Sequence, residues 1–385
     1  MKRTARYGAA ALVLGLGLAA CSSSSSSKSS SGATTTSMGG SAAATCGKPT
    51  GSGPYKVGFV YVGPVNDGGW TQAHDTGRKM AQTDLGSKVV TTYKENVKEG
   101  PDAATAIENL VNDGNRMIFA TSFGYQDAMV EAAKKHPDVC FEQATGFKTA
   151  TNLGEYYGAG EDTDYLVGMT AGAATKNGKI GFVAPFPIPE VIREINSYTL
   201  GAQATHPGAT VQVVWTKSWF DPTKERQAAE SLIAAGVDTL GQGQDSPSTG
   251  EAAKAKGLPW SGYDSDQSAN FPDIWLTGTV YNWGPYYKGR IQAGMDGTWK
   301  SDNYYGGPQD EFVKLAPFGK IVTKDTQDKV NAKLAGFKDG SFYHLTGPLT
   351  DQAGQVRVPD GTKMTLDKVL SMDWFVKGVI GNPKG

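Results

Sequence analysis

The sequence predicts an α/β fold in which two doubly wound parallel sheets form two lobes joined by a hinge. The first reason is that apolar runs such as 55–62 (YKVGFVYV) are nearly continuous, which is typical of parallel strands covered by helices on both faces. The second is that helical segments alternate with these runs in two successive series. The third is that 385 residues, 39% of them hydrophobic, are enough to form two separate cores.

Residues 1–20 are expected to be a signal peptide that takes no part in the fold. Basic residues at its start precede an apolar stretch that is too short to span a bilayer in the usual way. Small residues directly before Cys21 resemble a bacterial lipobox. We therefore expect Cys21 to be lipidated and the protein to be exported and anchored to the outer face of a bacterial membrane; an ordinary signal peptide with an incidental cysteine is the alternative. The Ser-rich segment 21–53 is expected to be a flexible tether.

The first lobe is expected to begin with residues 54–160. Pro101 opens one of its helices and Gly114 stops it, as the residue preferences at helix ends predict. Cys140 lies in the last strand of this series and Cys46 precedes the lobe, so in an oxidising setting they are candidates for a disulfide; two unpaired thiols are the alternative. The strands are expected at 55–62, 87–93, 116–120 and 138–143, and the helices from Trp70 onward and at 101–113 and 126–136.

The second lobe is expected to span residues 161–282. A helix at 284–299 then carries the chain back, so residues 283–385 are assigned to lobe 1 and to a C-terminal extension with few apolar segments. No repeat of solenoid length is visible. The strands of this lobe are expected at 179–184, 210–216, 237–243, 258–264 and 274–280, and the helices at 165–175, 189–204, 222–236 and 249–257.

Aromatic side chains follow the ends of several predicted strands. Open parallel sheets bind ligands beyond the carboxyl ends of their strands, which places the expected cleft between the two lobes. Stacking a base on an aromatic ring contributes roughly 1–3 kcal/mol. Ordinary core or rim packing is the alternative for each ring taken singly. The aromatic residues expected to contact the ligand are Trp70, Phe123, Phe186, Trp219 and Trp283.

Carboxylates recur at the same strand ends. They accept charge-assisted hydrogen bonds from ring N–H, amine or hydroxyl groups. Helix capping explains Asp67 and Asp221 equally well. Asp245 and Asp264 are stronger candidates, because no clear helix pattern begins directly after either. Asn66, Asp67, Asn196, Asp245 and Asp264 therefore join the aromatic residues in the expected ligand-binding set; Asp127, Asp221 and Asp266 occupy similar positions at strand ends.

Catalytic and nucleic-acid signatures are not evident. The four histidines are scattered, and no zinc-binding spacing, nucleophile elbow or phosphate loop is found. A formal charge of -1 gives no reason to expect a nucleic-acid partner. We therefore expect no enzyme, cofactor or metal site. A metal-assisted nucleoside hydrolase remains the alternative from another class, although the NDGGW loop offers only one carboxylate.

Four strings together resemble one family. These are KVGFVYVGPVNDGGWTQAHDTGR after residue 55, GYDSD, YNWGPYY and MDWFVKGV. They are similar to the basic membrane protein family, also called PnrA-like, of substrate-binding lipoproteins for ABC transporters. The resemblance implies a type I periplasmic-binding-protein fold that closes on a purine base or nucleoside and delivers it to a membrane permease.

The resemblance also carries expectations for individual residues. It implies that Asn66, Asp67 and Trp70 contact the purine and that Asp264 contacts ribose. Relatives that bind nucleosides have a lysine after the strand that follows the GYDSD segment. This chain has Asn282 and Trp283 at that place. This difference favours a free base such as adenine. A binder of sugars or other small solutes, and a surface receptor unconnected to transport, are the alternatives.

Overall fold

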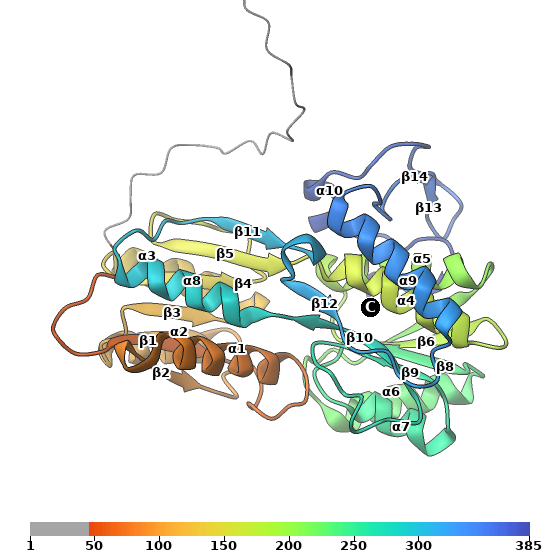
Figure 1. The fold of residues 1–385 in the computed structure, drawn as a ribbon, viewed down its shortest axis with the longest axis horizontal. Helices are drawn as coiled ribbons and strands as arrows, with labels where there is room; N and C mark the ends of the chain where they lie inside the picture. Colours follow the sequence, from red (N-terminus) through yellow and green to blue (C-terminus); the bar gives the residue numbers. More distant parts are fainter. Residues whose placement is uncertain (1–45) are drawn as a thin grey trace, which may run out of the picture. The chain divides into compact units, whose positions relative to one another are not determined.

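The computed structural model describes residues 46–385, which form two lobes that each contain a central sheet (Figure 1). The predicted signal peptide 1–20, the lipidation site Cys21 and the tether as far as residue 45 lie outside the described residues. The predicted α/β class is confirmed: the strands of each sheet are parallel except for one edge pair, and helices cover both faces.

Lobe 1 contains a six-stranded, wholly parallel sheet in the order β11-β5-β4-β3-β1-β2. Helices α1 and α8 pack on one face, and α2 and α3 pack on the other. The strands are β1 (Tyr55–Val60), β2 (Val89–Lys94), β3 (Met117–Ala120), β4 (Cys140–Ala144), β5 (Leu153–Gly158) and β11 (Asn303–Gly306). The helices are α1 (Trp70–Leu85), α2 (Pro101–Asn112), α3 (Gln126–Lys135) and α8 (Trp283–Met295), with short 3₁₀ turns at Gly86–Lys88 and Phe123–Tyr125.

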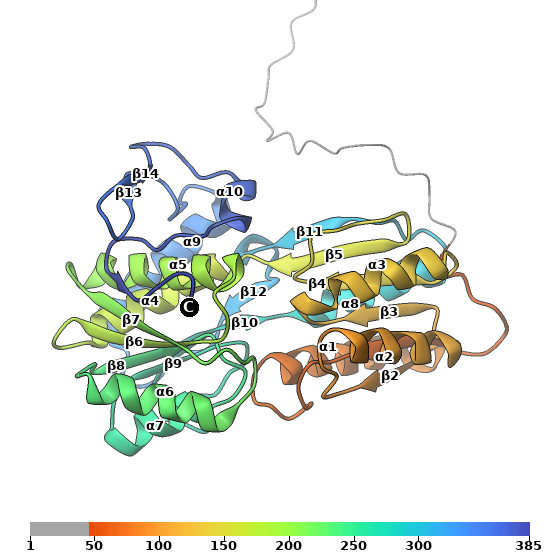
Figure 2. The same ribbon diagram turned by 180° about the vertical axis from the view of Figure 1, so that it is seen from behind.

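Lobe 2 contains a seven-stranded sheet in the order β12-β10-β9-β8-β6-β7-β15, in which only β12 runs antiparallel to its neighbour. Figure 2 shows the same lobe from behind, with the C-terminal segment above α5. The strands are β6 (Lys179–Ala184), β7 (Thr210–Trp215), β8 (Thr239–Gln242), β9 (Trp260–Gly262), β10 (Trp275–Tyr281), β12 (Val313–Leu315) and β15 (Val379–Ile380). The helices are α4 (Gly160–Ala174), α5 (Pro189–Thr205), α6 (Pro222–Ala234), α7 (Ser248–Lys256), α9 (Lys324–Asp339) and α10 (Leu366–Leu370), with a 3₁₀ turn at Pro308–Asp310 and a hairpin of β13 (Leu349–Thr350) and β14 (Val356–Val358).

Helices α4 and α5 of lobe 2 cross at very short range. A Cβ atom added at Gly201 would lie 1.8 Å from the carbonyl oxygen of Tyr165, and one added at Gly168 would lie 2.0 Å from that of Tyr198. Because no larger residue fits at either crossing point, these glycines fix the position of α5. The N-terminal end of α5 is thereby held at the boundary between the lobes, where the site described below is found.

Residues 283–385, expected to return to lobe 1 and to form a C-terminal extension, are divided between the two lobes. Only α8 and β11 return to lobe 1, whereas β12 and β15 add edge strands to the sheet of lobe 2. The C-terminal segment packs against α5 through buried apolar side chains. Few residues of the C-terminal segment form helices or strands. Its apolar residues therefore follow no helical or strand period, and this packing could not be predicted from the sequence. The buried residues are Leu345, Leu349, Val358, Met364, Val369, Met372, Phe375, Val376 and Val379.

Two further features differ from the expectations or extend them. Strand β5 was missed, because its sequence LGEYYG mixes polar and aromatic residues, yet all six of its residues are buried. Helix α4 begins at Gly160, five residues earlier than expected, and Glu161 and Asp162 lie in its first turn, where the helix dipole favours acidic groups. Cys46 and Cys140 form a disulfide that ties the segment before β1 to the start of β4.

Candidate ligand-binding cleft

A small cavity of about 20 Å³ lies between the two lobes, beyond the carboxyl ends of strands from both sheets. Its lobe 1 wall follows β1, β3 and β4, and its lobe 2 wall comes from α5 and the segments after β7, β8 and β9. This is the location that the strand-end rule predicts. The lining residues are Val62, Trp70, Ser122, Phe123, Thr145, Glu190, Val191, Glu194, Trp219, Gly243, Asp245 and Tyr263.

Trp70 is the first residue of α1 and lines the lobe 1 side of the cavity. Its Nε1 donates a 2.6 Å hydrogen bond to the carbonyl oxygen of Thr121, which follows β3. The rings of His74 and Trp283 pack edge to face against the indole, at centroid distances of 4.3 and 5.4 Å. These contacts hold the ring in one orientation, so it can act as a preformed stacking surface.

The turn before α1 brings the two lobes into contact. A Cβ atom added at Gly69 would lie 2.4 Å from the carbonyl oxygen of Asp245 in lobe 2. The side chains of Ser265 and Gln267, also from lobe 2, donate hydrogen bonds to the carbonyl oxygen of Gly68. The glycines of the NDGGW loop are therefore explained by the close approach of the lobe 2 backbone, and the two lobes are in contact at this turn.

Asp67 caps helix α1. Its carboxylate accepts hydrogen bonds from the backbone N–H groups of Gly69, Thr71 and Gln72, at 2.9, 2.8 and 3.0 Å. Burial raises the pKa of Asp67 above its ordinary value, although these three N–H groups act in the opposite direction. Asp67 is not part of the cavity wall, and its geometry is that of the capping alternative.

Asp245 and Asp264 are buried carboxyl groups of lobe 2 near the cavity. Oδ2 of Asp245 and both carboxyl oxygens of Asp264 accept no hydrogen bond from the described residues. Burial, together with nearby carboxylates, raises the pKa of each well above the ordinary value. Asp264 also has a φ of 65°, in the left-handed region that is uncommon for a residue other than glycine. Such strained, unsatisfied groups concentrate at binding sites.

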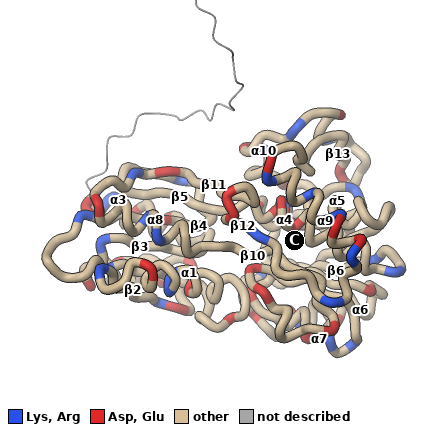
Figure 3. Tube along the Cα trace, in the orientation of Figure 1, with Lys and Arg blue, Asp and Glu red and all other residues tan. Residues whose placement is uncertain are grey.

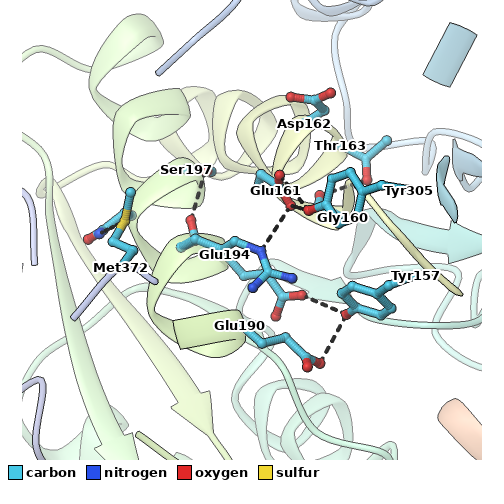
Figure 4. A network of polar contacts seen from close by, with 12 residues as sticks. Tyr157, Gly160, Glu161, Asp162, Thr163, Glu190, Glu194, Ser197, Tyr305 and Met372 are labelled. Carbon is cyan, nitrogen blue, oxygen red and sulfur yellow. Dashed lines mark hydrogen bonds and ion pairs between the residues drawn. The ribbon is translucent and has the colours of Figure 1, made fainter. Parts of the chain in front are cut away.

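A network of tyrosines and glutamates continues the wall at the start of α5 (Figure 4). The hydroxyl group of Tyr157 from lobe 1 lies 3.0 Å from Oε1 of Glu190 and 3.1 Å from Oε1 of Glu194. The hydroxyl of Tyr263 donates to the same Glu194 oxygen at 2.8 Å. Burial raises the pKa of Glu190, and it raises that of Glu194 well above the ordinary value. The network links the two lobes at the edge of the cavity.

The structure brings four of the predicted site residues together in the cavity wall, namely Trp70, Phe123, Trp219 and Asp245. Asp264 follows the lining residue Tyr263 directly and interacts electrostatically with Asp245. Sequence reasoning missed Glu190 and Glu194. A usable signal existed, because Glu190 follows the strand-end tract PFPIP and Glu194 lies one helical turn later on the same face.

The other predicted contacts lie elsewhere. Asn66 is exposed, and Phe186 packs against Trp219 at 5.2 Å without lining the cavity. Trp283 is buried, because α8 begins at this residue and its ring stacks between His74 and Tyr281, at 4.2 and 4.8 Å. In this structure these side chains therefore lie at the surface or in the core, and their contact with a ligand stays a prediction.

Asn196 is a structural residue and not part of the cavity wall. Its side chain donates to the carbonyl oxygen of Trp374 at 2.8 Å and accepts from the backbone N–H of Val376 at 2.9 Å. It therefore anchors the C-terminal segment to α5. The remaining strand-end carboxylates make local contacts: Asp127 with Lys148, Asp221 as the cap of α6, and Asp266 with the backbone of Ser268.

Three further kinds of site concern the described residues: charged patches, metal clusters and membrane-spanning helices. Lys and Arg are interspersed with Asp and Glu over both lobes (Figure 3). Within residues 46–385, no cluster of three or more His, Cys, Asp or Glu side chains is arranged to hold a metal ion. None of the helices in the same range has the length and apolar character needed to cross a membrane.

Residues 55–337 match the model of the Bmp family, described as PnrA-like ABC transporter substrate-binding proteins. The chain belongs to this family. The predicted family is thereby confirmed, and this Bmp protein is an ABC transporter substrate-binding protein. Substrate-binding proteins of ABC transporters act outside the cytoplasm.

Named relatives of this Bmp protein differ in what they are said to bind. A purine-binding protein of Brucella abortus is 43% identical over 324 residues, which cover 84% of this chain and 92% of the relative. An ABC transporter glucose-binding protein of Haloferax volcanii is 36% identical over 286 residues, covering 74% of this chain and 73% of the relative. A nucleoside-binding protein of Lactococcus lactis is 25% identical and covers 63% of this chain and 62% of the relative.

Solved structures support the fold of this Bmp protein. An ABC transporter solute-binding protein of Aeropyrum pernix superimposes with a TM-score of 0.66 at 17% identity, covering 75% of this chain and 93% of that one. A solute-binding protein of Conexibacter woesei gives a TM-score of 0.62 at 20% identity, with coverage of 75% and 98%. The type I periplasmic-binding-protein fold is therefore confirmed.

Proposed function

We propose that this Bmp protein captures a purine, with a free base such as adenine favoured over a nucleoside, and delivers it to an ABC permease in the membrane. One observation carries the proposal: the fixed indole of Trp70 lines an interlobe cavity together with Asp245, which has a buried oxygen without a hydrogen-bond partner among the described residues. A flat ring with N–H groups suits both features.

The aromatic residues of the cavity support a planar ligand. Trp70 and Phe123 come from lobe 1, and Trp219 comes from lobe 2, so rings are available on both sides of the cleft. Each base-ring stack contributes about 1–3 kcal/mol, and two stacks would supply most of the affinity of a micromolar binder together with a few hydrogen bonds. The purine-binding relative at 43% identity supports the same ligand class.

The carboxyl groups support recognition of ring N–H or amine groups. A ligand that donates hydrogen bonds to Asp245 and Asp264 would satisfy oxygens that no described residue satisfies. Among the residues that the structure describes, the cavity wall contains no lysine. Trp283 lies in the segment where nucleoside-binding relatives have a lysine, and its ring is buried and stacked on Tyr281. Both observations favour a base without its sugar.

Calorimetry with adenine, adenosine and glucose tests the proposal. Adenine is expected to bind most tightly, and the Asp245→Asn variant to weaken that binding at least about tenfold, a loss of about 1.4 kcal/mol. Binding of glucose without binding of either purine would establish the sugar-binding alternative, for which the glucose-binding relative at 36% identity provides the support. Ligand recovered unchanged after incubation with adenosine distinguishes a binding protein from a nucleoside hydrolase.

The membrane anchor is a separate part of the proposal. We infer that Cys21 is lipidated, because small residues precede it and a Ser-rich stretch follows. Labelling of bacterial cells with a fatty-acid analogue should mark the wild-type chain and leave the Cys21→Ser variant unmarked. Equal labelling of both would assign the lipid to another residue.

A further inference from the structure

A second cavity, here called the outer chamber, lies beside the interlobe cavity and shares part of its wall. Its volume is about 330 Å³, whereas that of the interlobe cavity is about 20 Å³. Phe123, Thr145 and Glu190 line both spaces, so these three residues form the junction between them. A group attached to a ring in the small interlobe cavity would reach the outer chamber past this junction.

The outer chamber has apolar side chains from both lobes. Lobe 1 contributes Phe123 and Phe147, whose ring centroids lie 6.1 Å apart. Lobe 2 contributes Ile188, directly before α5, and Leu370, the last residue of α10. Phe147 is 65% exposed and Leu370 is 38% exposed, so both walls present apolar surface to water. A ligand group that covers this surface would gain the free energy of apolar burial.

Several polar side chains of the chamber wall already have partners within the protein. Nε of Arg193 lies 3.3 Å from Oε2 of Glu161, and the hydroxyl of Tyr305 donates to the same carboxyl group at 2.8 Å. The hydroxyl of Tyr157 lies 3.0 Å from Oε1 of Glu190 (Figure 4). An apolar group would leave these bonds intact, whereas a hydroxylated group would have to compete for them.

The junction differs from the chamber because it presents acceptor oxygens. Oγ1 of Thr145 is buried without a hydrogen-bond partner among the described residues. The backbone of Thr145 has a φ of 61°, in the left-handed region that is uncommon for a residue other than glycine. An N–H group at the junction would satisfy this oxygen, and the carboxyl group of Glu190 can accept such a bond whether or not it is protonated. The chemistry of the junction therefore suits an amine that links a ring to an apolar group.

We propose that the outer chamber is a subsite for an apolar substituent on the exocyclic amine of a purine, so that the protein accepts N-substituted aminopurines in addition to the free base. The inference rests on the proposed function for the purine ring itself. Leu370 lies beyond residue 337, where the match to the family model ends, so membership of the family does not imply this wall.

The test compares aminopurines with and without an apolar substituent. Calorimetry is performed on the purified protein with adenine and N6-benzyladenine, and with 2-aminopurine and 2-benzylaminopurine. In at least one pair the benzylated member is expected to bind at least about tenfold more tightly than its parent, because the chamber buries the benzyl group. The N-methyl analogue of that pair is too small to fill the chamber and should bind within about threefold of the parent.

Two variants locate the substituent. Phe147→Ala and Leu370→Ala remove apolar surface from the two walls and should each lower the gain from the benzyl group at least about threefold, while the parent compound binds as in the wild type. Leu366→Ala is the matched control, because Leu366 is an exposed residue one helical turn earlier in α10 and does not line the chamber. It should keep the full gain.

The outcomes separate the inference from the proposed function. Binding of a parent compound with a gain below about tenfold in both pairs would overturn the inference and leave the proposed function standing. A gain that neither Phe147→Ala nor Leu370→Ala lowers would place the benzyl group elsewhere and would also overturn it. If no purine binds, the proposed function and the inference both fail.

Discussion

The indole nitrogen of Trp70 and the backbone carbonyl oxygen of Thr121 are joined by a 2.6 Å hydrogen bond. The bond connects the first residue of α1 to the segment that follows β3, so the orientation of the ring is set by two elements of lobe 1. A ring held in this way loses little rotational freedom when a ligand stacks on it, which favours affinity.

The Trp70→Phe substitution separates the stacking surface from its hydrogen bond. Phenylalanine keeps an aromatic face but has no N–H group, so one of the contacts that hold the ring is lost. We expect purine affinity to fall about 5- to 20-fold by calorimetry, within the roughly 1–3 kcal/mol of a base stack. Phe220→Leu, next to Trp219 in lobe 2 and outside the cavity wall, is a control that should bind normally. Wild-type affinity in Trp70→Phe would show that the hydrogen bond to Thr121 does not contribute to binding.

The Asp264→Asn substitution should raise stability while lowering affinity. Asparagine tolerates the left-handed φ of 65° at this position and cannot carry the buried charge. Because burial raises the pKa of Asp264, the aspartate becomes more costly to the folded state as pH rises. We expect the free energy of unfolding at pH 8 to increase by about 1 kcal/mol and purine affinity to fall at least about tenfold. Loss of stability with unchanged affinity would assign Asp264 a purely structural role.

Glu155 should make folding stability depend on pH. Burial raises its pKa from 4.5 to about 8, although Gln126 and the backbone of Lys148 donate hydrogen bonds to it. Between these two values the folded chain holds a proton that the unfolded chain has lost, so stability falls as pH rises through the window. Between pH 5 and pH 7.5, the free energy of unfolding measured by urea titration should fall in both proteins. The fall should be smaller in the Glu155→Gln variant, by on the order of 2 kcal/mol. Parallel curves for the two proteins would show that Glu155 does not titrate there.

The disulfide between Cys46 and Cys140 should stabilise the fold without affecting the cleft. It closes a loop with a sequence separation of 94 residues, and Cys140 begins β4 at the end of the strand remote from the cavity. The Cys46→Ser, Cys140→Ser double variant should lose about 2–5 kcal/mol of unfolding free energy. Its purine affinity should remain within threefold of the wild type by calorimetry. A larger loss of affinity would connect the disulfide to the site.

The Asn196→Ala substitution distinguishes a structural role of this residue from the predicted ligand contact. It would leave the backbone N–H of Val376 without its partner and free the C-terminal segment from α5. We expect a loss of about 1–3 kcal/mol in stability and faster proteolysis near the C-terminus, with purine affinity unchanged. If affinity falls and the tail stays protected, Asn196 contacts the ligand after all.

The fold was predictable where hydrophobic periodicity is strong. Apolar runs such as residues 179–184 predicted most strands of both sheets, and the family strings predicted the fold type. Strand β5 was not predictable from its pattern, because Tyr156 and Tyr157 are buried by tertiary contacts that leave no alternation in the sequence. The short edge strands β11 and β12 have too few residues for any period to be seen.

The site was predictable only in part, for a related reason. The rule that ligands bind at strand ends found Trp70 and Asp245, which lie in the segments after β1 and β8. Glu190 and Glu194 lie within a helix, where a charged residue ordinarily indicates a solvated face. That α5 points its first turns at the other lobe depends on its close packing against α4, which only the folded structure shows. Trp283 was misplaced because the end of β10 and the start of α8 are adjacent in sequence.

The order of strands in the two sheets has a consequence for synthesis. Strand β11, residues 303–306, is the last strand of the first sheet, and β15, residues 379–380, is the last of the second. A nascent chain therefore lacks the last strand of one sheet until residue 306 has left the ribosome, and the last strand of the other until residue 380 has left it. Neither lobe corresponds to a continuous stretch of the sequence. A chain that ends before residue 303 therefore lacks a strand of each sheet and leaves unpaired backbone groups at a sheet edge.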